Sequence, residues 1–344
     1  MKYTMEIPKP NLLLSIILFF NGILIFGQSK FIINDSVMEP RVRVIIDNDF
    51  GGDPDGLFQL AHHLLSPTVE IKGIIGSIQY GNGFYGHPGN AQYSAEKALE
   101  LLQIMKLDKE FVVLEGINHP LKDTINSNSN STATLIIEEA LKDSVKPLYI
   151  VCGAGLTNLA NAYLKEPKIA DKLILVWIGG TEYEEIASPP PGANKKWEYN
   201  SGIDINACKV IFNQSEIPIW QIPRDAYRQA LVSYAELATK VKTVGKTGKY
   251  LMDCLDDLLK RSNRSLGEAY VLGDSPLVML TALQSSWERD PSSSKYLIKN
   301  APKVSEENLF APNKYGREIR VYYDLDNRLM FEDFFAKLAL FENN

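Results

Sequence analysis

Four aspartates lie within nine residues near the start of the chain, with two glycines and a proline between them: Asp47, Asp49, Asp53 and Asp55. Carboxylates this close repel one another, and a divalent cation would turn that repulsion into binding energy. Oxygen ligands of this kind favour Ca²⁺ or Mg²⁺. The spacing therefore predicts a metal site, the alternative being a solvated acidic turn.

The residues on either side predict the elements that position these carboxylates. Val42–Ile46 is an apolar, β-branched run that indicates a buried strand. Apolar residues then recur at helical spacing from Leu57 to Leu64, with Asp55 placed to cap the helix. The order is strand, acidic loop, helix. In an open α/β sheet, ligands bind at the carboxyl ends of strands, where this loop would lie.

The acidic stretch resembles the N-terminal signature of the inosine-uridine preferring nucleoside hydrolases, a strand ending in D-x-D-x-G followed by two adjacent aspartates. Asp47 and Asp49 match the D-x-D, and Asp53 matches the first aspartate of the pair. Pro54 stands at the second, and Asp55 lies one residue beyond. Which of Asp53 and Asp55 binds the metal is left open.

Three further segments resemble the family, in the family's order. Residues 153–160 are similar to G-x-L-T-N-x-A at a strand-to-helix turn, and residues 197–204 to A-E-F-N-x-x-x-D. Asp274 matches the aspartate of H-D-P-x-A, but Gly273 stands where the family has a histidine that often protonates the leaving group. The resemblance spans about Val44 to Leu277, and the order of the segments is its specific part.

The resemblance implies a site built around one Ca²⁺ ion. Its ligands would be Asp49, Asp53, Asp55, the carbonyl of Thr157, and Asp274. Asp49 would be the general base, with Asp47 supporting the loop from behind. The ribose would be bound by Glu198, Asn200 and either Asn82 or Asn90. Four side chains near the matching segments could contact the base: Tyr270, Tyr227, Arg224 and Trp197.

Net charge, the N-terminal segment and the cysteines indicate the class of partner and the cellular location. The chain has 344 residues, a net charge of −6 and no basic patch, which argues against nucleic acid as a partner. Residues 1–27 have a positive start and a long apolar run, as in a secretory signal peptide. We expect residues 28–344 to be exported to the periplasm or secreted, the alternative being an uncleaved anchor.

Three widely spaced cysteines, Cys152, Cys208 and Cys254, indicate buried free thiols, with one disulfide as the alternative.

Strands and helices alternate along the rest of the chain. We expect strands near residues 69–75, 111–114, 147–151, 172–178, 217–222, 296 and 318–323. Helices are expected at residues 91–105, 133–141, 232–260 and 331–341. This alternation predicts an α/β fold, a single domain with a mostly parallel, doubly wound sheet flanked by helices, as in the nucleoside hydrolases.

The resulting hypothesis is metal-dependent hydrolysis of the N-glycosidic bond of ribonucleosides, which releases nucleobase and ribose. The partner would be a small nucleoside, and the resemblance implies a homo-oligomer. Two alternatives remain open. One is a phosphatase of the haloacid-dehalogenase type, with Asp47 as nucleophile and Asp49 as acid. The other is a nucleoside- or sugar-binding protein of the same fold without catalysis, suggested by Pro54 and Gly273.

Overall fold

The computed structural model describes residues 37–81, 83–192, 197–288, 293–308 and 310–343. Its main sheet has eight strands in the order β11-β14-β8-β7-β6-β1-β2-β5. The strands are β1 (Val42–Asn48), β2 (Val69–Gly76), β5 (Val113–Glu115), β6 (Leu148–Cys152), β7 (Leu173–Ile178), β8 (Ile219–Ile222), β11 (Lys295–Asn300) and β14 (Glu318–Asp324). All neighbours pair in parallel except β11 and β14, which are antiparallel. The expected mostly parallel α/β sheet is confirmed.

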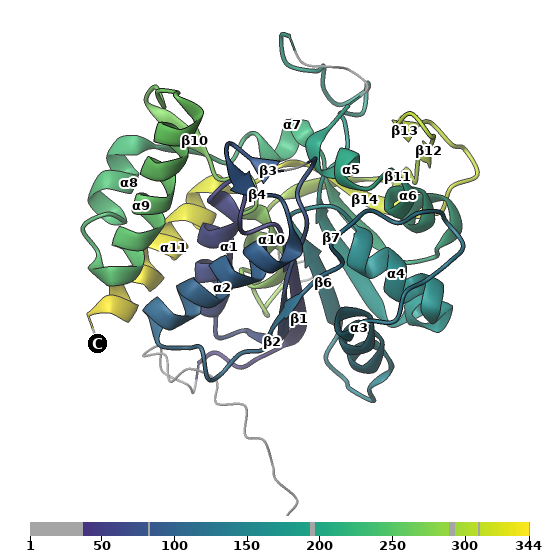
Figure 1. Ribbon diagram of the computed structural model, residues 1–344, viewed down its shortest axis with the longest axis horizontal. Coiled ribbons are helices and arrows are strands. Elements are labelled where there is room, and N and C mark those ends of the chain that lie inside the picture. The colour runs from purple at the N-terminus through teal and green to yellow at the C-terminus, as the bar shows by residue number, and fades with distance from the viewer. Residues whose placement is uncertain (1–36, 82, 193–196, 289–292, 309, 344) are drawn as a thin grey trace, which may run out of the picture.

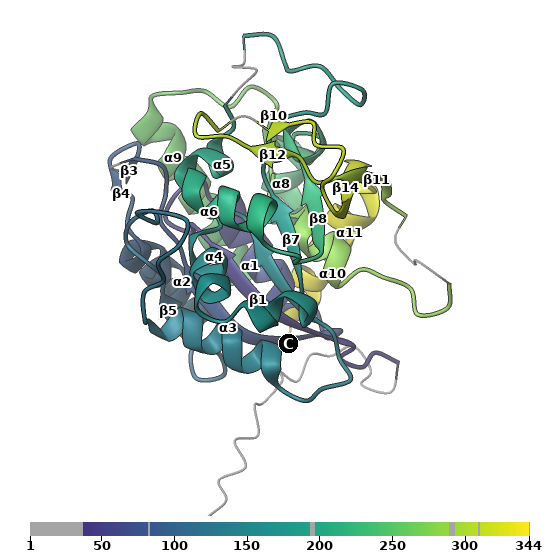
Figure 2. The ribbon, with the colours of Figure 1, turned by 90° about the vertical axis from the view of Figure 1, so that its right-hand side faces the viewer.

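Helices cover both faces of this sheet (Figures 1 and 2). One face carries α1 (Asp55–Leu64), α2 (Ala91–Met105), α8 (Tyr234–Lys240), α9 (Gly245–Ser262), α10 (Pro276–Thr281) and α11 (Asn327–Glu342). The other carries α3 (Ser131–Leu141), α4 (Thr157–Lys165) and α6 (Ile205–Lys209). The short helices α5 (Tyr199–Ile203) and α7 (Arg224–Tyr227) follow strands β7 and β8. Short strands form three further pairs: β3 (Gly83–Phe84) with β4 (His87–Pro88), β9 (Leu231–Ser233) with β10 (Ala269–Val271), and β12 (Lys303–Val304) with β13 (Phe310–Ala311).

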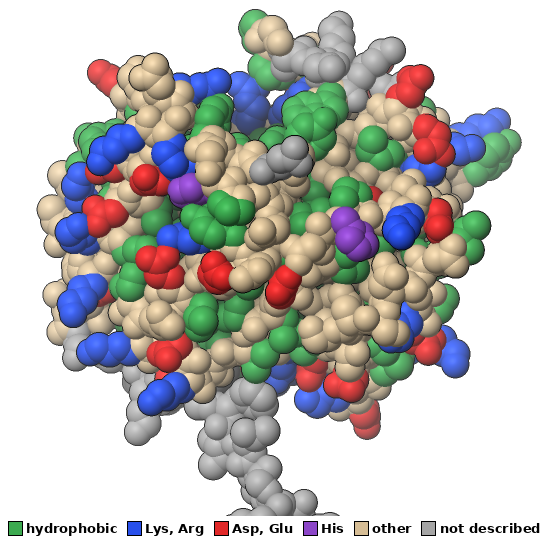
Figure 3. All heavy atoms as spheres, in the orientation of Figure 1, with side chains coloured by type: hydrophobic (Ala, Val, Ile, Leu, Met, Phe, Trp, Pro, Cys, Tyr) green, Lys and Arg blue, Asp and Glu red, His purple; other side chains and the backbone are tan. Residues whose placement is uncertain are grey.

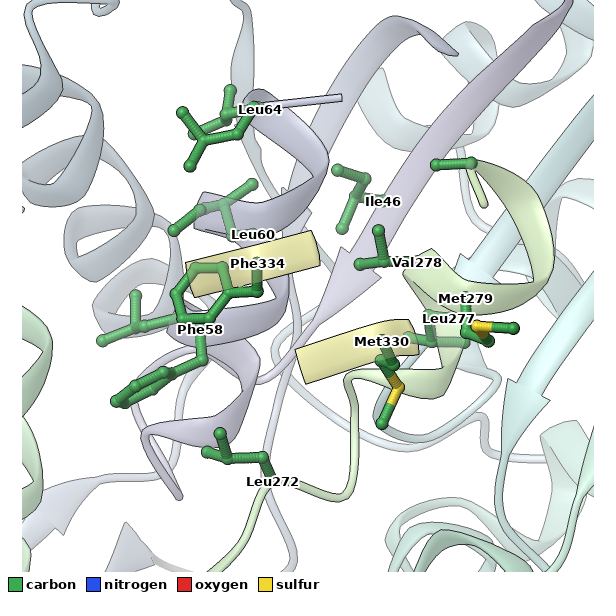
Figure 4. Packing of buried hydrophobic residues seen from close by; sticks show 14 of the residues in the cluster. Ile46, Phe58, Leu60, Leu64, Leu272, Leu277, Val278, Met279, Met330 and Phe334 are labelled. Atoms are coloured by element: carbon green, nitrogen blue, oxygen red, sulfur yellow. The ribbon is translucent and has the colours of Figure 1, made fainter. Parts of the chain in front are cut away.

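The strands are buried on both sides because their side chains alternate between two cores. In β1, Val44 and Ile46 join the core under α1, whereas Ile45 joins the core under α4. Figure 4 shows Phe58 on α1 close to Phe334 on α11, whose ring centroids are 6.0 Å apart. Each such side chain contributes about 1.5–3 kcal/mol when fully buried. This packing fixes β1 and α1, and with them the acidic loop that joins the two elements.

The order in which the strands were added to the sheet reverses beside β1. From β1 the order runs to β2 and β5 on one side, and to β6, β7 and β8 on the other. Asp47 pairs with Cys152 at the carboxyl end of β6, and the amide of Gly153 donates to the Asp47 carbonyl at 3.1 Å. The loops after β1 and β6 therefore begin side by side, where open α/β sheets bind their ligands.

Two expected helix caps are wrong, and one is confirmed. Asp55 is the first residue of α1, after Pro54, and Thr157 is the first residue of α4, after Leu156; neither side chain caps its helix. Thr157 Oγ1 instead donates to Asp204 Oδ2 at 2.9 Å. Asp204 caps α6 as expected, accepting from the amide of Ala207 at 2.9 Å. A tertiary partner has replaced the local cap at Thr157.

The structure also tests the expectations about the cysteines, the helix at residues 232–260 and the surface charge. Cys152, Cys208 and Cys254 are free thiols, as expected; Cys152 and Cys208 are buried, whereas Cys254 is partly exposed. The expected helix at residues 232–260 is divided into α8 and α9, with part of β9 at its start. Lys and Arg are interspersed with Asp and Glu on the face seen in Figure 3. Within the described ranges, no helix is both long and apolar enough to span a bilayer. The expected signal peptide lies outside the described residues.

Candidate active site

The acidic loop and a distant aspartate meet at the carboxyl end of β1. Asp49, Asp53 and Asp55 are partly exposed, whereas Asp274, which lies just before α10, is only 4% exposed. Asn48 joins the two segments: its Nδ2 donates to Asp274 Oδ2 at 2.9 Å, and its Oδ1 accepts from the amide of Asp49 at 2.8 Å. Sequence reasoning missed Asn48, although it is the middle residue of the D-x-D pattern.

Burial raises the pKa values of all four carboxylates, and repulsion adds to the shift for Asp49, Asp55 and Asp274. Burial raises the pKa of Asp274 to about 7, and the charge of Asp53 acts in the same direction. Burial likewise raises the pKa of Asp53 to about 6, against a hydrogen bond from Tyr270. Asp49 and Asp55 have pKa values well above the ordinary range, because of burial first and repulsion from Asp274 and Asp53 next. The state in which all four carboxylates are ionised at once is therefore disfavoured.

The donor chemistry of this region fits a hard cation, but its geometry is not that of a closed cage. Within the ranges that the structure describes, no group of three or more His, Cys, Asp or Glu side chains is arranged so that it could hold a metal ion. Asp53 accepts instead from the Tyr270 hydroxyl, and Asp274 from Asn48. Both donors are uncharged, and each stabilises one carboxylate without the approach of a second one. A cation among these carboxylates would offset their mutual repulsion.

Asp47 lies behind the loop and is fully buried. Its Oδ1 accepts from the Ser77 hydroxyl, and the Asn158 amide approaches its two oxygens at 3.2 and 3.3 Å. Burial raises its pKa to about 7 despite these hydrogen bonds. The side chain thus links β1 to the segments that follow β2 and β6. A carboxylate enclosed in this way has no access to a phosphoryl group, so the geometry opposes the phosphatase hypothesis.

Thr157 lies at the end of the loop after β6 and is 3% exposed. Its hydroxyl is engaged by Asp204, as described above. Only its carbonyl was expected to bind the cation. That role stays a prediction.

Glu198 and Asn200 flank the first residue of α5. Glu198 is 1% exposed and caps this helix; its oxygens accept from the amides of Gly180, Asn200 and Ser201 and from the Tyr227 hydroxyl, at 2.8–3.1 Å. Asn200 Nδ2 donates to the carbonyls of Gly153 and Ile178 at 3.0 and 2.9 Å. Both amide hydrogens of Asn200 are thus committed, and Oδ1 is the atom that it offers to a ligand hydroxyl.

Gly273 faces the same carboxylates. A Cβ atom at this position would lie 3.3 Å from Asp55 Oδ2 and 3.5 Å from Cδ2 of Tyr227. The position of the family's histidine is therefore at the site, and in this chain it carries no side chain. Asn82 lies outside the described residues, and the other candidate, Asn90, caps α2 by accepting from the amide of Tyr93 at 2.8 Å.

Two cavities lie away from the carboxylates. One of about 300 Å³ lies behind the acidic loop and is lined by Gly51, Pro54, Cys254 and Arg261 among others. A larger one, of about 620 Å³, includes Trp287. Neither is lined by Asp49, Asp53, Asp55 or Asp274. The size of these cavities therefore does not identify the site, which is defined by its carboxylates.

Comparisons with known proteins agree on one family. The family model described as inosine-uridine preferring nucleoside hydrolase matches residues 44–328. The inosine-uridine preferring nucleoside hydrolase of Crithidia fasciculata is 28% identical over 161 residues, which cover 45% of this chain and 48% of that protein. The corresponding Leishmania major protein is matched over 43% of its length, so the chain spans about half the length of these curated relatives.

Solved structures share the fold. A purine-preferring ribonucleoside hydrolase from Gardnerella vaginalis has a TM-score of 0.67 at 21% identity, covering 88% of this chain and 100% of that one. The type III effector protein XopQ, complexed with adenosine diphosphate ribose, has a TM-score of 0.58 at 14% identity and covers 88% and 94%. Because the family model covers most of the chain, including every carboxylate described above, this chain belongs to the inosine-uridine preferring nucleoside hydrolase family.

Proposed function

We propose that this chain hydrolyses the N-glycosidic bond of ribonucleosides in a Ca²⁺-dependent reaction and releases nucleobase and ribose. One observation carries the proposal: the aspartates of the β1–α1 loop and the distant Asp274 gather at the carboxyl end of β1 and repel one another. The repulsion between these carboxylates would be offset by a bound cation or by a positively charged transition state.

The reaction replaces the bond between the base and C1 of ribose with a bond to water, through a transition state that resembles an oxocarbenium ion. Asp49 accepts a proton from the attacking water. A bound Ca²⁺ would be held by Asp49, Asp53, Asp55, Asp274 and the Thr157 carbonyl, and it would lower the pKa of that water. Asn200 Oδ1 accepts a hydrogen bond from a ribose hydroxyl, and Glu198 holds α5 in place beside it.

The proposal is tested by a ribose-release assay on the purified protein. The relatives are named for inosine and uridine or for purines, so the panel includes purine and pyrimidine nucleosides. We expect release that EDTA abolishes, that Ca²⁺ restores and that Asp49→Ala removes. The matched control is Asp143→Ala, which removes an exposed carboxylate. Release that persists in EDTA would contradict the metal requirement. Release by Asp49→Ala at the original rate would contradict the role of Asp49.

A second candidate is a nucleoside- or sugar-binding protein without turnover. It is favoured by Gly273 in place of the histidine, and by the similarity to a protein that is complexed with adenosine diphosphate ribose. Calorimetric binding of a nucleoside, with no release of ribose, would establish this function instead.

We further propose that residues 1–27 direct export to the periplasm or out of the cell, and that residues 28–344 form a homo-oligomer. N-terminal sequencing of the exported protein and light scattering of the purified protein test these two statements. An N-terminus that still carries residue 1, or a mass equal to one chain, would contradict the corresponding one.

A further inference from the structure

The polar side chains that the sequence offered as partners of the base already have acceptors. Hydroxyl groups of Tyr270 and Tyr227 donate to Asp53 and Glu198, and the Arg224 guanidinium pairs with Glu182. Arg224 also donates to the Trp197 carbonyl at 2.8 Å. These groups hold the walls of the site together. A hydrogen bond from Tyr270, Tyr227 or Arg224 to a ligand would therefore compete with one of these contacts.

The Tyr199 hydroxyl, in contrast, has no acceptor for its hydrogen among the described residues. It is the first residue of α5, and its hydroxyl oxygen is buried and makes no hydrogen bond of ordinary geometry with any described residue. Burial raises the pKa of Tyr199, and so do the charges of Asp49, Asp53 and Asp55. The backbone amide of Tyr80 acts in the opposite direction, as a donor to the oxygen. The phenol therefore stays protonated beside the acidic loop, with its own hydrogen free.

A buried hydroxyl whose hydrogen has no acceptor is costly to the folded protein. Replacing the tyrosine by phenylalanine would remove this cost. The ring of Tyr199 already packs against the small apolar cluster that includes Ile78 and Ile203. The hydroxyl adds nothing to that packing, so its value must come from something that the protein binds.

The other side of Tyr199 is aromatic. Its ring centroid is 6.2 Å from that of Tyr80 and 6.1 Å from that of Trp197, which are 5.4 Å from each other. Phe84 adds a fourth ring, 6.2 Å from Tyr199, and Tyr80 is 48% exposed. Aromatic rings of this kind bind flat, aromatic groups by stacking. Tyr199 thus stands at the junction between a region suited to the sugar and a region suited to an aromatic aglycone.

We propose that Tyr199 donates the hydrogen bond that stabilises the departing nucleobase, and that the Tyr80–Trp197 pair stacks on it. This inference rests on the proposed function. Cleavage leaves the electron pair of the broken bond on the base, while the hydroxyl of water joins C1 of ribose. The second proton of the water passes to Asp49 and then to the base, so Tyr199 keeps its own proton.

The test compares Tyr199→Phe with the unaltered protein on two kinds of substrate. A nucleoside needs help for its base to depart, whereas the nitrophenolate of p-nitrophenyl β-D-ribofuranoside departs without it. We expect kcat to fall at least about tenfold on inosine and uridine and less than about twofold on the nitrophenyl riboside. Tyr250→Phe is the matched control, because its hydroxyl is also buried and makes no hydrogen bond of ordinary geometry with any described residue. That variant should retain both rates.

Other outcomes overturn the inference. Equal losses on both substrates would mean that the hydroxyl only maintains the shape of the site, and unchanged rates on both would mean that it has no role. If the unaltered protein cleaves neither substrate, the proposed function itself fails, and this inference fails with it. A thermal midpoint for Tyr199→Phe at or above that of the unaltered protein would show that the variant is folded.

Discussion

The two ends of α1 carry buried polar groups that are arranged in opposite ways. At its first turn, Asp55 lies among other carboxylates, and burial first and their repulsion next raise its pKa. At its last turn, His62 Nε2 contacts Asp333 Oδ2 at 2.7 Å, and Lys337 Nζ contacts the same oxygen at 2.6 Å. Burial acts to raise the pKa of Asp333, but the hydrogen bond from His62 and the charge of Lys337 lower it below its ordinary value.

The contrast separates structure from function within one helix. The cluster around Asp333 satisfies its own charges and needs nothing from outside the chain. The acidic end gathers like charges, and its hydrogen-bond donors, Asn48 and Tyr270, are neutral at ordinary pH. A buried polar cluster that balances its own charges indicates a structural role, whereas one that repels itself indicates a site that awaits a cation or substrate.

The largest expected effect is on catalysis at the acidic end. Asp49→Asn keeps the shape of the side chain but removes its charge and most of its basicity. We expect kcat for nucleoside hydrolysis to fall about 10²–10⁴-fold. Urea unfolding should give an unchanged or higher free energy, because one repelled carboxylate has been removed. A variant with lower stability and full activity would reverse the comparison.

Asp333→Ala should do the opposite at the other end of α1. It leaves Lys337, whose side chain is 7% exposed, without its charge partner, and it removes the hydrogen bond from His62. Because the Asp333 side chain is 25% exposed, we expect a loss of about 1–3 kcal/mol in the free energy of unfolding, less than for a fully buried pair. The kcat for nucleosides should stay within about twofold of the original. A large loss of activity without a loss of stability would count against a structural role.

The smallest effect is a dependence of stability on pH. Burial lowers the pKa of His62 from 6.5 to about 4 in the folded protein, against the hydrogen bond with Asp333. The unfolded chain therefore binds this proton more readily, so the contribution of His62 is present above pH 6.5 and is lost as the pH falls toward 4. We expect His62→Gln to reduce the slope of unfolding free energy against pH in this range, by up to about 1.4 kcal/mol per pH unit. An unchanged slope would show that His62 titrates normally.

Most of the fold could be predicted because the apolar pattern is regular. The helix at Ala91–Met105 was predicted with its observed bounds, and β1 was placed within two residues. Short elements such as α5 and β10 were missed, because three to five residues hold too little periodicity. The cap proposed for Thr157 was wrong because its hydroxyl has a tertiary partner, Asp204. The cap proposed for Asp55 was wrong because α1 already begins at Asp55, whose side chain accepts from the amide of the next residue, Gly56.

The site was predictable only in part. The aspartates could be identified because they are clustered in sequence or match a family pattern. Asn48 and Tyr199 could not, because their importance depends on contacts with residues far along the chain or on the lack of a partner. Glu198 was expected at the ribose, but its oxygens already accept from three backbone amides and from Tyr227, which no local pattern reveals.

Calcium titration of the metal-free protein by calorimetry tests the central claim most directly. We predict one Ca²⁺ site per chain that disappears in Asp49→Ala and in Asp274→Ala and persists in Asp333→Ala. This result would place the cation between the acidic loop and the segment before α10. Absence of binding to the unaltered protein, or equal binding by Asp49→Ala, would contradict the claim that the repelling carboxylates at the carboxyl end of β1 exist to hold a metal ion.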